Sequence, residues 1–198
     1  MQKFINQLDT IFKGKSRAKL PSHCLDNDNE ELLFLEDNEK EKKTIFVKES
    51  VSEEYAEQNC FTISNRDKKD VYLWAIDGCF VGLGKPLSEN YPQKCDCAFG
   101  YENNICFVEF KLHALSIAHP KTIQANREKA RDQLESTICF LRDAYGQTDT
   151  LKIEGYEIEA YICTPTTYPN KNTAITNMSI EFLEKYKIGL FESNDKTI

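Results

Sequence analysis

Residues 95–112 constrain the fold more than any other part of the chain. Two apolar runs, at residues 95–99 and 105–112, lie on either side of the sequence Gly-Tyr-Glu-Asn-Asn at residues 100–104. Apolar and aromatic runs bounded by glycine and asparagine are typical of β-strands joined by a tight turn. The pattern therefore predicts an antiparallel β-hairpin.

Three charged side chains interrupt these apolar runs. If Gly100 pairs with Ile105 across a four-residue loop, Asp96 lies directly opposite Glu109. Cross-strand neighbours have Cβ atoms about 5 Å apart, and like charges at that spacing destabilise the pair. The two carboxylates therefore predict a bound cation. Lys111 lies two residues beyond Glu109 on the same strand face, where its ammonium can reach a phosphate or a water near that cation.

The short Glu-x-Lys pattern is common, so its surroundings decide its meaning. Residues 41–43 and 67–69 also match it, but both triplets lie in charged runs and indicate surface or turn. Only Glu109 and Lys111 interrupt an apolar strand. Burying a charge costs several kcal/mol unless the charge is paired or bound to metal. The alternative to a metal site is a structural ion pair, in which Lys111 only neutralises a carboxylate.

The arrangement resembles the PD-(D/E)XK nuclease superfamily, whose hallmark is an acid on one strand and Glu-x-Lys on the next. Cys95 stands where the family usually has proline. The resemblance implies that Asp96, Glu109 and the backbone carbonyl of Phe110 bind Mg²⁺ or Mn²⁺, which prefer oxygen ligands. It also implies that Lys111 orients the attacking water or offsets charge developing on phosphorus.

Further residues are candidates for completing such a site. The resemblance implies a third acid, often on the first core helix or strand, for which the candidates are Glu54, Glu57 and Asp77. It also implies a polar side chain from the helix after Glu-x-Lys, for which the candidates are Lys129 and Gln133. Surface solvation is an equal alternative for these two. The basic residues that could line a path for a nucleic-acid backbone are Lys85, Lys94 and Lys121.

The cysteines and histidines predict little further chemistry. Eight cysteines without a recognisable secretory signal predict reduced thiols, mostly buried as small apolar side chains. Cys95-x-Cys97 is a weak zinc signal because no second Cys/His pair follows at a familiar spacing. His113 and His119 favour a loop or capping role over catalysis, and His23 is assigned no chemistry.

Periodicity and capping signals predict the remaining elements. Ser50 and Glu53 form a potential capping box, and Pro120 and Gly146 bracket the longest helix. The predicted helices are residues 2–13, 50–58, 120–145 and 177–187, and the strands besides the hairpin are residues 32–35, 44–47, 71–76, 156–163 and 188–191. Periodicity alone predicts a mixed α/β or α+β domain with one sheet. From residue 50 onward the order is similar to the αβββαβ restriction-endonuclease-like core, a mixed sheet flanked by helices, with a C-terminal helix and strand.

Charge is unevenly distributed along the chain. The formal net charge is −7, and residues 26–57 carry twelve acids against four bases, whereas residues 1–25 carry five bases and one acid. A separate acidic stretch is usually a solvated linker or face. We therefore expect an N-terminal helix and acidic linker at residues 1–42 and a PD-(D/E)XK nuclease-like domain at residues 43–198.

These features predict a Mg²⁺-dependent nuclease that cuts DNA, or less readily RNA. By analogy with the superfamily, it would be the effector of a restriction or phage-defence module, with specificity or activation supplied by self-assembly or a partner protein. The alternative is an acidic, non-catalytic binding protein, such as an immunity protein or an inhibitor that imitates nucleic acid. A third possibility is a catalytically silent scaffold. No stretch approaches the length of a membrane span, so we expect a cytoplasmic protein.

Overall fold

The computed structural model describes residues 22–80, 87–113, 119–169 and 173–198. The helix predicted at residues 2–13 and the candidate Lys85 lie outside these ranges. Within them the fold is mixed α/β, with two mixed sheets and several helices, and is compatible with the α+β class. Among the described residues, no helix combines the length and apolar character that a membrane crossing requires.

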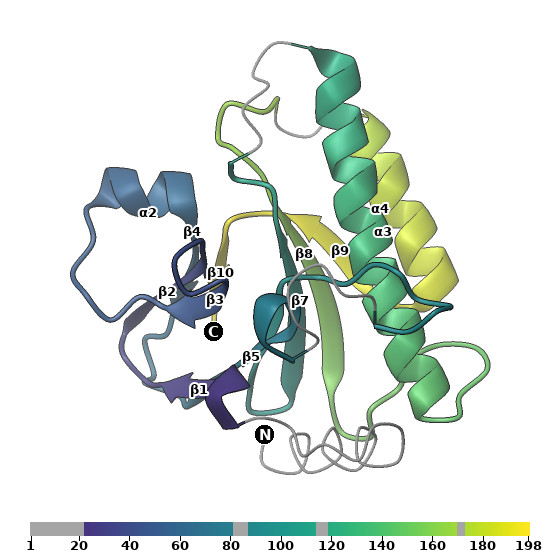
Figure 1. The fold of residues 1–198 in the computed structure, drawn as a ribbon, viewed down its shortest axis with the longest axis horizontal. Helices are drawn as coiled ribbons and strands as arrows, with labels where there is room; N and C mark the ends of the chain where they lie inside the picture. Colours follow the sequence, from purple (N-terminus) through teal and green to yellow (C-terminus); the bar gives the residue numbers. More distant parts are fainter. Residues whose placement is uncertain (1–21, 81–86, 114–118, 170–172) are drawn as a thin grey trace.

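The larger sheet has six strands and contains the predicted hairpin (Figure 1). In spatial order the strands are β1 (Leu25–Asp28), β5 (Val71–Ala75), β6 (Cys97–Tyr101), β7 (Asn104–Phe110), β8 (Glu157–Cys163) and β9 (Gly189–Glu192). The first four strands pair antiparallel, whereas β7, β8 and β9 run parallel. Parallel neighbours need a long crossover, and here each crossover contains a helix.

Those two helices, α3 (Pro120–Ala144) and α4 (Thr173–Tyr186), lie side by side on one face of the larger sheet (Figure 1). The start and end of α3 confirm the capping signals. Pro120 occupies the first turn, the His119 side chain accepts a hydrogen bond from the Lys121 amide, and Gly146 has a positive φ of 68° just past the end. The face of α3 that packs on the sheet contributes the buried residues Ile123, Ala130, Leu134, Ile138 and Leu141.

A second sheet of four strands covers the opposite face of the larger sheet. Its strands, in spatial order, are β10 (Asp195–Thr197), β4 (Cys60–Ser64), β2 (Leu32–Asn38) and β3 (Lys43–Phe46). Leu35, Phe61 and Ile63 from this sheet pack with Phe99 and Val108 of the larger one in a single apolar cluster. The short helix α2 (Glu53–Asn59) packs on β4 and β2.

The second sheet corrects several predictions. The single predicted sheet is replaced by two, and the strands β1, β4 and β10 were not predicted. The run at residues 32–35 forms an internal strand between β3 and β4 rather than an edge. The cap of α2 is Ser52, whose hydroxyl accepts from the Tyr55 amide, so Ser50 is not the cap. The described part of residues 1–42 contributes β1 and β2 to the two sheets.

The prediction of eight reduced cysteines is wrong for one pair. Cys24 and Cys79 form a disulfide with a Cα–Cα distance of 5.5 Å. They are 55 residues apart in sequence, and the antiparallel pairing of β1 with β5 brings their chain segments together. The other six cysteines are free, and all but the half-buried Cys139 are buried.

Candidate metal centre

The hairpin has the register that the sequence predicts. Gly100 pairs with Ile105, and extending this register by one residue beyond the pair of Cys97 and Val108 places Asp96 opposite Glu109. The turn is tighter than expected because the pairing continues to Tyr101 and leaves two loop residues instead of four. The register brings two carboxylates to the same end of the larger sheet.

Asp96 lies immediately before β6 and is 8% exposed. Its Oδ2 accepts a hydrogen bond from the Phe110 amide at 2.6 Å. The backbone carbonyl of Asp96 accepts from the amides of Ile76 and Asp77 at 2.9 and 3.0 Å. These contacts fix the Asp96 backbone between β5 and β7 and hold its carboxylate beside the end of β7.

Glu109 is the more deeply buried of the two acids, with 1% of its surface exposed. Its Oε1 accepts a hydrogen bond from the Lys111 ammonium, which also donates to Gln133 Oε1 at 2.9 Å. The Gln133 amide in turn donates to the Lys94 carbonyl at 3.0 Å. The other carboxylate oxygen, Glu109 Oε2, is buried and has no hydrogen-bond partner among the described residues. The Lys111 ion pair therefore satisfies only half of this carboxylate.

Burial and mutual repulsion make the ionised form of both carboxyls costly. Burial is the main cause that raises the pKa of Asp96 to about 7, and the negative charge of Asp37 adds to it. Burial, followed by the charge of Asp96, raises the pKa of Glu109 well above its usual range. Lys111 opposes both shifts without cancelling them. A divalent cation between the two carboxylates would offset their mutual repulsion and favour their ionised forms.

Asp37 is a member of this carboxylate group that the sequence does not single out. It lies half-buried on β2, and burial together with the charge of Asp77 raises its pKa. The turn after β2 approaches the bend that contains Asp77 at Gly78, whose φ is +74°. A Cβ on Gly78 would lie 1.5 Å from the Lys42 carbonyl oxygen, so this close approach requires glycine. The sequence contains a signal that could have identified Asp37: strand alternation puts it on the same face of β2 as the buried Leu35.

The other predicted residues divide into two groups. Gln133 contacts Lys111 directly, and Asp77 pairs with Lys94 at 3.1 Å, so both belong to the surroundings of the carboxylates. Lys94 is 6% exposed, and its ammonium is engaged by Asp77 instead of lining an open surface. The remaining described candidates are all exposed, and their roles stay predictions: Glu54 and Glu57 on α2, and Lys121 and Lys129 on α3.

The donor set fits a hard divalent cation. Asp96 and Glu109 offer neighbouring carboxylate oxygens, and no amine, amide or hydroxyl donor among the described residues reaches the buried Glu109 Oε2. Oxygen donors of this kind suit Mg²⁺ or Mn²⁺. Among the described residues, Cys95 and Cys97 belong to no group of three side chains that could hold a zinc ion.

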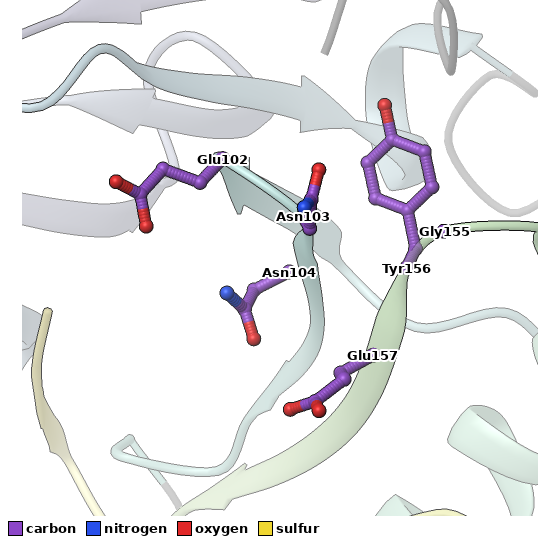
Figure 2. A pocket seen from close by; sticks show the side chains of 6 residues that line it. All are labelled: Glu102, Asn103, Asn104, Gly155, Tyr156 and Glu157. Atoms are coloured by element: carbon purple, nitrogen blue, oxygen red, sulfur yellow. The ribbon is translucent and has the colours of Figure 1, made fainter.

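A surface pocket lies at the other end of the hairpin and is separate from this site. Figure 2 shows its lining residues at the hairpin turn and at the start of β8, with the side chains of Glu102 and Glu157 beside it. Asn104, another lining residue, begins β7, whereas Glu109 lies near the opposite end of that strand. The pocket contains no residue of the carboxylate group.

Comparison with known proteins gives no match: no family model, no curated protein and no solved structure is similar to the chain. The interpretation of the site therefore rests on its own residues and geometry.

The raised pKa of Asp96 predicts a pH dependence of stability in the presence of a chelator. Between the ordinary value of 3.8 and the folded value of about 7, folded Asp96 holds a proton that the unfolded chain has lost. The free energy of unfolding should therefore fall as pH rises through this window. Urea unfolding between about pH 5 and 7 should show a shallower fall in Asp96→Asn, and an unchanged fall in the exposed control Asp149→Asn. An unchanged slope in Asp96→Asn would contradict the prediction.

Proposed function

We propose that the chain is a metal-dependent nuclease that hydrolyses phosphodiester bonds in DNA, using Mg²⁺ or Mn²⁺ held by Asp96, Glu109 and the Phe110 carbonyl. The observation that carries the proposal is the unsatisfied, buried Oε2 of Glu109 beside a second buried carboxylate and the Lys111 ammonium. A structural ion pair explains the contact between Lys111 and Glu109. It does not explain why the chain buries two adjacent acids against one partner.

The order of elements around the site supports a restriction-endonuclease-like core. Three antiparallel strands, β5 to β7, are followed by α3, the parallel strand β8, α4 and the parallel strand β9. The carboxylates are positioned by the β6–β7 hairpin, and α3 supplies Gln133. This is the placement that the resemblance to PD-(D/E)XK nucleases implies for the acid, the Glu-x-Lys motif and the helix that follows it.

The side chains have separable roles in this mechanism. When bound, the cation would polarise a phosphoryl oxygen and lower the pKa of a coordinated water. Asp96 and Glu109 would hold it, and the Phe110 amide keeps the Asp96 carboxylate oriented through the 2.6 Å hydrogen bond. Lys111, fixed by Gln133, would place a positive charge near the phosphoryl oxygens, on which negative charge develops in the transition state.

We further propose that the protein acts in the cytoplasm as the effector of a restriction or phage-defence module, as a homo-oligomer or with a protein that supplies specificity. The formal net charge of −7 supports the need for self-assembly or a partner protein, because an acidic chain alone gains little non-specific affinity for nucleic acid. Lys121, a predicted contact for the nucleic-acid backbone, is exposed on α3 and is free of the carboxylate group.

The test is cleavage of supercoiled plasmid, single-stranded DNA and RNA with Mg²⁺, Mn²⁺ or chelator. We expect cleavage of DNA that requires the metal, and a loss of about 100-fold or more in Lys111→Met, because the charge it supplies acts in the transition state. Lys152→Met is the matched control, since Lys152 is exposed and lies outside the site. Full activity in Lys111→Met would exclude the mechanism. Tight, salt-sensitive binding to a basic protein, with no cleavage and no metal response, would favour the acidic binding protein instead.

A further inference from the structure

The Cys24–Cys79 disulfide joins two short segments that are far apart in sequence. Cys24 ends the turn η1 (Ser22–Cys24), which leads into β1, and Cys79 lies in η2 (Ile76–Phe80), the bend that follows β5. Cys24 is 2% exposed, whereas Cys79 is half-buried. Cys79 is therefore the more accessible residue of the pair.

An imidazole lies next to both sulfurs. His23 is exposed, and one of its ring nitrogens and the two Sγ atoms all lie within 4.8 Å of one another. A nearby imidazolium stabilises a thiolate, which is the form that attacks and leaves in thiol–disulfide exchange. In contrast, burial raises the pKa of thiols such as Cys106 and Cys163, which disfavours their thiolate forms. Cys24 and Cys79 are thus the cysteines best placed for exchange.

The same bend forms one wall of the carboxylate group. Asp77 lies two residues before Cys79, its amide donates to the Asp96 carbonyl at 3.0 Å, and its carboxylate pairs with Lys94. Gly78 packs against the Lys42 carbonyl at the turn that follows β2, the strand of Asp37. The disulfide therefore anchors the chain segment that orders the backbone of Asp96.

We infer that Cys24 and Cys79 are a reversible thiol–disulfide switch that controls cation binding at Asp96 and Glu109. Reduction by a dithiol transfers two electrons and two protons, which breaks the S–S bond, forms two thiols and leaves the dithiol as a cyclic disulfide. A small disulfide such as oxidised glutathione reverses the step and leaves as two thiols. Such behaviour fits the proposed cytoplasmic location, where disulfides are usually transient and regulatory. The effect on cation binding rests on the proposed metal site, whereas the exchange chemistry does not.

The first experiment counts thiols in the full chain by alkylation under denaturing conditions and mass spectrometry. After treatment with oxidised glutathione, six of the eight cysteines should be alkylated, and after dithiothreitol all eight. Cys139→Ser should keep the difference of two, whereas Cys24→Ser should lower it to one at most, because Cys79 can then form only a mixed disulfide with glutathione. Eight free thiols under both conditions would overturn the switch. So would one equivalent of zinc that persists in the purified protein and is lost in His23→Ala, because the same side chains would then hold a metal.

The second experiment measures Mn²⁺ affinity by calorimetry in the oxidised and reduced protein. Residues that orient metal ligands typically affect affinity 10- to 100-fold, so we expect binding to weaken about tenfold on reduction. Cys24→Ser should bind weakly in both states, whereas Cys139→Ser should respond like the wild type. Equal affinity in both states would overturn the control of cation binding. Absence of Mn²⁺ binding in both states, with the thiol counts as expected, would instead count against the proposed function and leave the exchange chemistry established.

Discussion

Glu109→Gln is expected to reduce metal-dependent cleavage by about 100- to 1000-fold and to make the protein more stable in chelator. The substitution keeps the shape of the side chain and removes its charge. It therefore removes a proposed metal ligand. It also removes a carboxylate whose charge is disfavoured by burial and by repulsion from Asp96. A gain of about 1–2 kcal/mol in the free energy of unfolding is expected, because the wild-type protein holds an incompletely paired carboxyl at 1% exposure.

The two effects must occur together for the interpretation to hold. Cleavage is measured at saturating Mg²⁺, and stability by urea unfolding in chelator at pH 7 and above. Glu184→Gln on α4 is the matched control, because Glu184 is exposed and should change neither quantity appreciably. If Glu109→Gln destabilised the protein in chelator, Glu109 would be a structural ion-pair partner of Lys111, and the metal centre would lose its main support.

The second large effect concerns Arg127, which is 1% exposed in the N-terminal half of α3. Its guanidinium donates to both carboxylate oxygens of Glu192 on β9, at 2.6 and 2.9 Å, and to the Pro169 carbonyl at 3.0 Å. Arg127→Ala should lower the free energy of unfolding by about 3–5 kcal/mol, because Glu192 is then left without its cation in a largely buried place. Urea unfolding measures the loss.

A nearby arginine provides the control for this prediction. Arg131 lies one turn further along α3 and pairs with its neighbour Asp132, with its side chain 31% exposed. Such an exposed pair contributes little, so Arg131→Ala should cost at most about 1 kcal/mol. Equal losses in the two variants would show that the interaction of Arg127 with Glu192 does not stabilise the contact between α3 and β9.

Local patterns predict the larger sheet except for β1, and they predict both of its helices. The bounds of α3 follow from Pro120 and Gly146, whose backbone preferences act within a few residues. The register of β6 and β7 follows from the position of the turn, and it places Asp96 and Glu109 together. The bounds of α3 and the register of the hairpin depend on residues close in sequence, so one amino-acid sequence is enough to predict them.

What the sequence does not reveal depends on contacts between distant segments. Nothing local to residues 60–64 indicates that they pair with both β2 and the C-terminal β10. The disulfide depends on the pairing of β1 with β5. Asp37 and Arg127 are instructive, since each occupies the buried face of its element at the correct spacing. A charge at such a position has a partner, but the sequence does not say which.

Mn²⁺ binding to the wild-type chain and to Glu109→Gln tests the central claim most directly. A ligand that binds the folded state alone raises its stability by an amount set by the ratio of concentration to Kd, about 2.7 kcal/mol at 100 times Kd. We predict that millimolar Mn²⁺ raises the Tm of the wild-type protein and leaves that of Glu109→Gln unchanged. An equal rise in both proteins would show that the cation binds elsewhere and would contradict the proposed centre.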